Sequence, residues 1–304
     1  MSTEMTASAT SIGWIGVGAM GRPMCDNLLR AGHRLTAYDQ DRSRLEALVA
    51  AGATAASSPG ALAAASDVVF STIFDDAGLR DIVLGSNGIA ASAGKGTTYV
   101  DMSTVSPAAS AVVAEGLAAC GIAYLRAPVS GTVTLATTGQ LSTFVSGPRT
   151  EFERLLPLLG VLTARQSHVG EGEEARVIKL LINLMVFMNT AVLGEALAFG
   201  ARGGLDRRLM LDAINDSIVG SAHYRGKADK IAQRDHQPVG PISLVIKDMD
   251  LALGVARENA AALPIAALVR QSLALMQSRG LSGLDVSALA DLDELVLLKP
   301  ASSN

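Results

Sequence analysis

The chain has 304 residues, of which 49% are apolar, 18% are charged and only 4% are aromatic. This length is enough for two domains of ordinary size, each with a sizeable core. The net charge of −4 and the scatter of both signs along the chain argue against a nucleic-acid partner.

Cysteine usage and the N-terminus bear on the compartment. Cys25 and Cys120 are the only cysteines, and four scattered histidines form no close pair. We therefore expect no disulfide framework, no metal site and a cytoplasmic location. The first ten residues lack the basic and apolar regions of a signal peptide, so we interpret them as a disordered tail.

The segment from Ile12 to Met24 predicts a buried strand, a glycine turn and a helix. Its glycines follow the G-x-G-x-x-G spacing of dinucleotide sites, at Gly16, Gly18 and Gly21. The first glycine permits the turn, the second allows a pyrophosphate to approach, and the third lets helix and strand pack closely. An ordinary tight turn is the alternative. The intervening residues belong to the predicted cofactor site as well: Val17, Ala19 and Met20.

Asp39 strengthens the dinucleotide interpretation. It ends the next predicted strand, 18 residues after Gly21, where a ribose-binding carboxylate is expected. A carboxylate there binds both adenosine ribose hydroxyls and repels a 2′-phosphate, so NAD is favoured over NADP. Arg42 and Arg44 follow closely and leave NADP open, because an arginine can hold a phosphate.

Strands and helices alternate through the first half of the chain. This alternation predicts a Rossmann domain over residues 11–172, with a doubly wound parallel sheet that binds ligands at the carboxyl ends of its strands. The strands are expected at 12–16, 34–38, 67–72, 97–101, 122–126 and 141–146. The helices are expected at 20–31, 43–51, 60–65, 77–84 and 107–119.

The second half is predicted to be an all-α domain over residues 173–299. Its first helix contains the apolar run Leu180–Phe199, which polar residues interrupt too often for a membrane span. We expect this long helix to join the domains and to be buried between other helices, apolar on nearly every side, with the active site in a cleft between the domains. The helices are expected at 173–202, 206–217, 222–233, 243–260, 264–279 and 286–297.

Lys179 opens the apolar helix, and Asn183 lies four residues on, on the same helix face. A lysine beside apolar surface loses hydration, which lowers its pKa toward neutrality and suits it to exchange a proton with a substrate hydroxyl. Asn183 offers a donor and an acceptor that orient the same hydroxyl. The alternative is a lysine extending to solvent beside a buried, satisfied asparagine.

Two segments that follow strands, and one late charge pair, are further candidates. The loop Ser130-Gly131-Thr132 offers N–H groups and hydroxyls to a carboxylate, although a plain connecting loop is the alternative. Asp101-Met102-Ser103-Thr104 is placed to meet the nicotinamide end of a cofactor, or Asp101 only caps a turn. Lys247-Asp248 is interpreted from its spacing as a surface charge pair.

Taken together, the segments resemble the β-hydroxyacid dehydrogenase family, from Ile12 to about Leu297. The motifs occur in family order: Gly16-x-Gly18-x-Met20-Gly21-x-Pro23-Met24, Asp101-x-Ser103-Thr104, Ala127-Pro128-Val129-Ser130-Gly131, Ala136-x-x-Gly139-x-Leu141, Lys179-x-x-x-Asn183 and Lys247-Asp248. Each motif is modest, but six in the right order are specific.

The resemblance implies roles for individual residues. Lys179 matches the family's catalytic lysine, and Asn183 matches its substrate-orienting asparagine. The carboxylate-binding loop corresponds to Ser130 and Gly131, followed by Thr132. Cofactor contacts are implied for Ile73, Phe74, Thr104 and Lys247. The family transfers hydride between NAD(P) and a small 3-hydroxy acid without a metal, and similar proteins form dimers or tetramers through the helical domain.

The chain departs from the family pattern at three positions. Arg126 stands where the family usually has an acid, Thr132 where it has a second glycine, and Gly78 where it often has asparagine. Arg126 either meets a second acidic group on the substrate or faces solvent. Two other functions compete: an NADP-dependent enzyme like the imine reductases, which usually lack the lysine, and a non-catalytic dinucleotide-binding protein.

Overall fold

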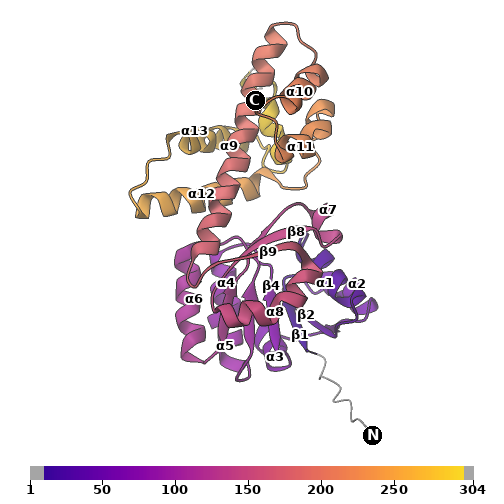
Figure 1. Ribbon diagram of the computed structural model, residues 1–304, viewed down its shortest axis with the longest axis vertical. Helices are drawn as coiled ribbons and strands as arrows, with labels where there is room; N and C mark the ends of the chain where they lie inside the picture. Colours follow the sequence, from indigo (N-terminus) through magenta and orange to yellow (C-terminus); the bar gives the residue numbers. More distant parts are fainter. Residues whose placement is uncertain (1–9, 298–304) are drawn as a thin grey trace. The chain divides into compact units, whose positions relative to one another are not determined.

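A computed structural model describes residues 10–297 of the chain. The chain packs as two compact units, Met1–Lys179 and Leu180–Asn304. A sheet with helices on both faces forms the first unit, and helices form the second (Figure 1). Apart from Thr10, the predicted N-terminal tail lies outside the described residues, as does the predicted domain end at 299. The predicted boundary at 172/173 stays a prediction.

The first unit contains a nine-stranded sheet with the order β3-β2-β1-β4-β5-β6-β8-β7, in which β9 also pairs with β8. Neighbours from β3 to β6 are parallel, whereas β8 is antiparallel to β6 and to β7. The predicted doubly wound sheet is confirmed, with an antiparallel addition. The strands are β1 (Ile12–Ile15), β2 (Leu35–Tyr38), β3 (Thr54–Ala55), β4 (Val68–Ser71), β5 (Thr98–Asp101), β6 (Ala123–Arg126), β7 (Val129–Ser130), β8 (Leu141–Ser146) and β9 (Thr163–Gly170).

Helices cover both faces of this sheet, so its strands read as continuous apolar runs. Side chains alternate along β1: Ile12 and Trp14 pack with α1, α2 and α8, whereas Ile15 packs with α3, α4 and α6. The helices of the first unit are α1 (Gly21–Arg30), α2 (Ser43–Ala50), α3 (Pro59–Ala64), α4 (Asp76–Leu84), α5 (Ile89–Ser92), α6 (Pro107–Ala119), α7 (Val133–Thr137) and α8 (Arg149–Leu162).

The sequence did not predict α8 or β9. Pro157 lies inside α8 and removes one backbone hydrogen bond, but Leu155, Leu158 and Leu159 are buried and hold the helix on the sheet. β9 has a polar sequence and is mostly exposed or half-buried, so it lacks an apolar pattern. The short elements β3, β7, α5 and α7 were also not predicted, because two to five residues carry too little periodicity.

The second unit is helical, as predicted. Its helices are α9 (Glu174–Arg202), which begins in the first unit, α10 (Arg207–Asp216), α11 (Ala222–Gln233), α12 (Ile242–Glu258) and α13 (Pro264–Ser278). The single helix predicted over 286–297 is wrong, because the chain forms the 3₁₀ helix η1 (Val286–Asp291) and the π-helix η2 (Asp293–Leu297). Asp285 accepts a hydrogen bond from the Ser287 N–H, two residues on, which starts a tighter turn.

The expectation that α9 is buried between other helices is wrong for one face of the helix in the single chain. Only 28% of its most apolar window is buried, and an apolar stripe is exposed. By length and composition alone α9 could cross a membrane, a test that core helices of soluble proteins also pass. Spacings of four and seven residues place the stripe on one helix face. Its members are Val177, Leu181, Met185, Val192 and Phe199.

Candidate functional site

The glycine turn between β1 and α1 is fixed by close backbone contacts. Gly16 has φ +90°, and a Cβ there would lie 2.1 Å from the carbonyl oxygen of Thr72. A Cβ on Gly21 would lie 2.0 Å from the carbonyl oxygen of Gly16. Neither position accepts a side chain without moving the backbone, so the protein itself requires both glycines.

Gly18 is different from the other two glycines. A Cβ there would meet only the Arg44 guanidinium, at 3.8 Å, and the backbone is not in the left-handed region. Protein packing therefore gives no reason for glycine at this position. Helix α1 begins at Gly21 without a side-chain cap, which leaves donors for an anion. The open position fits a pyrophosphate lying against the turn.

Asp39 packs against this turn. One carboxylate oxygen accepts the Val17 N–H at 2.7 Å, and the other accepts the Asp41 N–H at 2.9 Å. Only 7% of Asp39 is exposed, and Arg44 approaches its carboxylate at 3.8 Å. The glycine turn and the predicted ribose-binding acid are therefore adjacent in the structure. The Arg44 side chain is half exposed, at 53%.

The residues predicted to face the nicotinamide follow two neighbouring strands. β4 and β5 are parallel, with Ser71 opposite Asp101, so the loops that follow them leave the sheet side by side. The Ile73 N–H donates to the Ser103 hydroxyl at 2.9 Å, which ties the two loops together. Phe74, the next residue, is 59% exposed.

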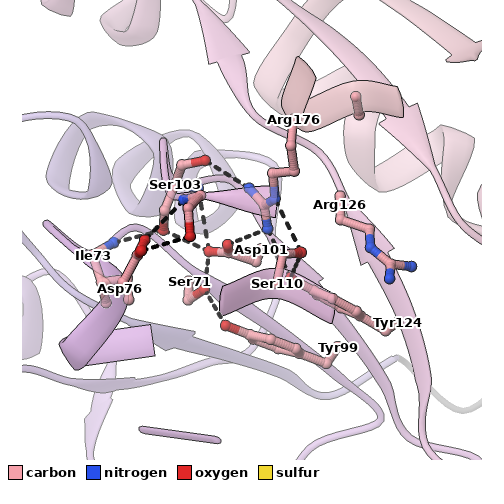
Figure 2. A network of polar contacts seen from close by, with 12 residues as sticks. Ser71, Ile73, Asp76, Tyr99, Asp101, Ser103, Ser110, Tyr124, Arg126 and Arg176 are labelled. Atoms are coloured by element: carbon pink, nitrogen blue, oxygen red, sulfur yellow. Dashed lines mark hydrogen bonds and ion pairs between the residues drawn. The ribbon is translucent and has the colours of Figure 1, made fainter. Parts of the chain in front are cut away.

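A buried polar network lies behind these loops (Figure 2). Asp101 pairs with Arg176 at 2.5 Å, and both side chains are fully buried. The second carboxylate oxygen of Asp101 accepts from the hydroxyls of Ser71, at 2.6 Å, and Ser103, at 2.5 Å. The network therefore links β4, β5 and the first turn of α9. Asp101 therefore does more than cap the following turn, because its carboxylate also pairs with Arg176.

Two stacked tyrosines complete the network from β5 and β6. The Tyr99 hydroxyl bonds Ser71 at 2.7 Å, and the Tyr124 hydroxyl accepts from Arg176 at 2.7 Å. Burial raises the pKa of both tyrosines, so their hydroxyls stay protonated. Burial alone would lower the pKa of Arg176, but Tyr124 and Asp101 outweigh it and the pKa is raised. The guanidinium is a permanent charge within the first unit.

Arg126, one of the departures from the family pattern, is paired within the chain. Its Nε and Nη2 donate to one oxygen of Glu173, at 2.9 and 2.5 Å, and its guanidinium lies 4.4 Å from the centre of the Tyr124 ring. Only 7% of Arg126 is exposed. The expectation that Arg126 faces solvent is therefore wrong, whereas contact with an acidic substrate group stays a prediction. Figure 2 places Arg126 beside Tyr124.

The segment predicted to bind a substrate carboxylate is partly a strand. Val129 and Ser130 form β7 against β8, Gly131 has φ +140°, and the Thr132 hydroxyl caps α7 by accepting the Leu135 N–H at 3.4 Å. A Cβ on Gly131 would lie 2.7 Å from Leu141, so this glycine is required by packing as well as by its backbone angle. Thr132 thus has a structural role that does not depend on substrate.

Lys179 and Asn183 lie one turn apart on α9, half-buried and buried respectively. The Asn183 Nδ2 donates to one oxygen of Asp248 at 2.7 Å, and the Lys247 Nζ lies 2.8 Å from the other. Asp248 is 4% exposed, so the surface-pair interpretation of Lys247-Asp248 is wrong. The bond to Asp248 uses one of the two Nδ2 protons of Asn183 and fixes the plane of its amide.

The sequence reasoning missed Glu173, Arg176 and the orienting role of Asp248. Their partners lie 47, 75 and 65 residues away, so spacing gives no signal for them. One hint existed: Glu173 and Arg176 lie just before a strongly apolar run, where charged side chains must be solvated or paired. In the described part of the chain, three or more His, Cys, Asp or Glu side chains do not gather at any point in a way that suits a metal.

Comparisons with known proteins agree over both units. Residues 11–170 match the model of the NAD binding domain of 6-phosphogluconate dehydrogenase. Residues 173–292 match the model described as NAD-binding of NADP-dependent 3-hydroxyisobutyrate dehydrogenase. Together the two models cover nearly all of the chain that the structure describes.

Individual relatives give the same result. The chain is 36% identical to 2-(hydroxymethyl)glutarate dehydrogenase of Eubacterium barkeri, covering 91% of this chain and 93% of the relative. It is 33% identical to 2-hydroxy-3-oxopropionate reductase of Escherichia coli, covering 94% and 97%. The crystal structure of 3-hydroxyisobutyrate dehydrogenase from Salmonella typhimurium superposes with a TM-score of 0.83 at 25% identity, covering 93% and 99%.

Proposed function

Because the chain belongs to the β-hydroxyacid dehydrogenase family, and is an NAD(P)-dependent oxidoreductase acting on a hydroxy group, we propose that Lys179 is its general acid–base. The substrate class is a small 3-hydroxy acid or the corresponding semialdehyde. The observation that carries this proposal is the Lys179–Asn183 spacing on α9, with the Asn183 amide oriented by buried Asp248.

Bound NAD(P) supplies the hydride acceptor or donor at nicotinamide C4. In oxidation, neutral Lys179 accepts the proton of the substrate hydroxyl while hydride leaves the carbon that bears this hydroxyl. In reduction, the Lys179 ammonium donates that proton to the developing alkoxide. The second Nδ2 proton of Asn183 donates to the substrate hydroxyl oxygen, so the hydroxyl proton stays directed toward Lys179.

The residues proposed to hold the cofactor follow the carboxyl ends of four strands, β1, β2, β4 and β5, and the family pattern adds Lys247. The N–H groups of Gly18, Ala19, Met20 and Gly21 face the pyrophosphate. The Gly16 and Val17 N–H groups are held within the protein by Tyr38 and Asp39, and Asp39 binds the adenosine ribose. By the family pattern, Ile73, Phe74, Thr104 and Lys247 contact the nicotinamide half. We propose a preference for NAD, with NADP used less well, because Asp39 is fixed while Arg44 is half exposed.

The substrate is proposed to carry a carboxylate, bound by Ser130, Gly131 and Thr132. The named relatives act on 2-(hydroxymethyl)glutarate and 2-hydroxy-3-oxopropionate, which are both carboxylates. The assignment rests on the resemblance of this segment to the carboxylate-binding loop of the family, and on the N–H groups and hydroxyls that the segment offers. No specific observation favours imine reduction or a non-catalytic role, and Lys179 with Asn183 speaks against both.

We also propose that a second copy of this chain packs on the exposed apolar stripe of α9, in a homodimer or homotetramer. Exposed apolar stripes of this length mark interfaces. The opposite side of the helix carries the buried Asn183–Asp248 bond, which a lipid environment does not favour. Light scattering after size exclusion tests the proposal, and a monomer, or partition of the protein into vesicles, contradicts it. The cytoplasmic location stays a prediction.

The decisive test of catalysis is Lys179→Ala, with exposed Lys95→Ala as the matched control. Both variants are assayed with NAD(H) and NADP(H) against 3-hydroxyisobutyrate, 2-(hydroxymethyl)glutarate, 2-hydroxy-3-oxopropionate, glyoxylate and succinic semialdehyde. Lys179→Ala is expected to lower kcat by roughly 10²-fold or more, while cofactor affinity stays within about threefold. Full activity of Lys179→Ala removes that residue from the mechanism.

A further inference from the structure

We propose that Arg176 is a positioning residue for Lys179. It holds the first turn of α9 on the carboxyl ends of β5 and β6, and so fixes the backbone from which Lys179 projects. The proposal rests on the proposed function, because it assumes that Lys179 exchanges the proton.

Arg176 contacts four separate parts of the first unit (Figure 2). Its Nη2 donates to Asp101 at 2.5 Å and to Tyr124 at 2.7 Å, its Nη1 donates to the Ser103 carbonyl at 2.7 Å, and its Nε donates to Ser110 at 3.3 Å. These partners come from β5, β6, the loop after β5, and α6. A planar guanidinium that satisfies four acceptors leaves the helix little freedom to rotate or slide.

The position of Arg176 along α9 makes this constraint relevant to catalysis. It precedes Lys179 by three residues, so the two Cα atoms are separated by about 4.5 Å along the helix axis. Residues three apart lie on adjoining parts of one face, and the helix transmits any shift of its first turn to Lys179. A misplacement of about 1 Å is enough to lower a rate by about 10²-fold.

The same network reaches the cofactor side. Ile73 bonds Ser103, Ser103 bonds Asp101, and Asp101 pairs with Arg176. One continuous set of buried hydrogen bonds therefore fixes both the loop predicted to meet the nicotinamide and the helix turn that carries the proposed acid–base. When one rigid hydrogen-bond network holds both the cofactor loop and the acid–base, the distance between the reacting groups stays constant.

A contribution to stability alone does not explain why the Asp101–Arg176 ion pair is buried in this protein. Removing a guanidinium and a carboxylate from water costs several kcal/mol each, and well-packed apolar side chains of similar volume often stabilise a fold as well or better. A second pair strengthens the same turn: Arg126, stacked on Tyr124, holds Glu173 immediately before α9 begins. Both ion pairs act on the helix start, which indicates that its exact placement matters.

The test uses Arg176→Lys, Arg176→Met and the double variant Asp101→Asn/Arg176→Met in the full chain. The exposed pair Arg149–Glu153 supplies the control Arg149→Met. Each variant is assayed with the most active substrate of the panel above. We expect kcat to fall by about 10²-fold for all three Arg176 variants, with KM and NADH affinity within about threefold. Lysine fails because a point charge does not replace a planar fork.

Two further measurements separate positioning from stability. The double variant removes both charges and is expected to regain most of the thermal stability but not kcat. In the Lys179→Ala background, Arg176→Lys is expected to change kcat by less than about threefold, because Arg176 acts through the missing amine. A double variant with wild-type kcat, or equal losses in both backgrounds, overturns the proposal.

A readout without turnover covers the case in which the panel contains no substrate. Hydrogen exchange of the α9 amides around residues 176–180 is expected to accelerate in the double variant and not in Arg149→Met. Unchanged exchange overturns the proposal. If Lys179→Ala keeps full activity while exchange accelerates, the proposed function fails but the anchoring by Arg176 stands.

Discussion

The glycine turn after β1 and the first turn of α9 are two parts of one unit that are built in opposite ways. The glycine turn consists of backbone: close carbonyl contacts at Gly16 and Gly21, with Asp39 as its one buried carboxylate. The start of α9 is held by side chains, in one fully buried and one partly buried ion pair whose partners lie far away in sequence. A short motif can encode the first, whereas only the folded sheet can assemble the second.

The largest effect is expected at the glycine turn itself. Gly16→Ala puts a Cβ 2.1 Å from the Thr72 carbonyl oxygen at a positive φ. We expect a loss of roughly 3–4 kcal/mol in unfolding free energy, measured by urea titration. Gly18→Ala is the control, because its Cβ meets only Arg44 at 3.8 Å. It should change stability by less than about 0.5 kcal/mol and weaken NAD binding instead. Equal stability losses for the two variants contradict the distinction.

The sequence predicted the glycine turn, Asp39 and the six main strands, because each depends on local spacing or on apolar runs that two-sided burial produces. It did not predict α8, whose Pro157 breaks the usual pattern, or the polar strand β9. The expectation that Arg126 faces solvent was wrong for a related reason. Its partner Glu173 becomes a neighbour only after β6 and the start of α9 pack together.

The ion pair at the start of α9 is expected to give the next largest effect. Arg126→Met leaves Glu173 without its cation, and Glu173→Gln leaves Arg126 without its anion. Each is expected to lower the unfolding free energy by about 2–3 kcal/mol, below the value for a fully buried pair because Glu173 keeps some exposure. The double variant should lose less than the sum of the two single losses.

The control for this cycle is the exposed pair Arg149–Glu153, where the same chemistry lies on a helix surface. Its removal is expected to change the unfolding free energy by less than about 0.5 kcal/mol. Additive losses at Arg126 and Glu173 would mean that the two charges stabilise the fold separately, and the contrast between the two turns would then disappear.

Cofactor preference gives a smaller effect, on binding rather than on folding. Asp39→Asn keeps an acceptor for the Val17 N–H but removes the charge. NAD affinity is expected to fall by about tenfold, near 1.4 kcal/mol, while NADP affinity stays equal or improves. Arg44→Ala should instead weaken NADP, since its half-exposed guanidinium is placed for a phosphate. Equal weakening of both cofactors by Asp39→Asn contradicts the NAD assignment.

The smallest effect is expected at the opposite end of the sheet. Asp67 precedes β4 and accepts from the Ser11 N–H at 2.8 Å and its hydroxyl at 2.7 Å, bonds that lower its pKa. A carboxyl with a lowered folded pKa contributes stability above its unfolded pKa of about 3.9, and loses that contribution as pH falls through the folded value.

Because Asp67 is exposed, its contribution should be only a few tenths of a kcal/mol. Urea unfolding measures this contribution when it is done both near neutral pH and about one unit below the usual carboxyl pKa of about 3.9. In Ser11→Ala, the difference in unfolding free energy between the two pH values should be smaller. Asp67 and Asp39 each accept two hydrogen bonds, but Asp39 is buried and also lies 3.8 Å from Arg44. If removing Asp67 lowers the unfolding free energy as much as removing Asp39, the hydrogen-bond donors around a carboxylate matter more to stability than its burial. The burial of Asp39 would then contribute less to the stability of the glycine turn than the geometry indicates.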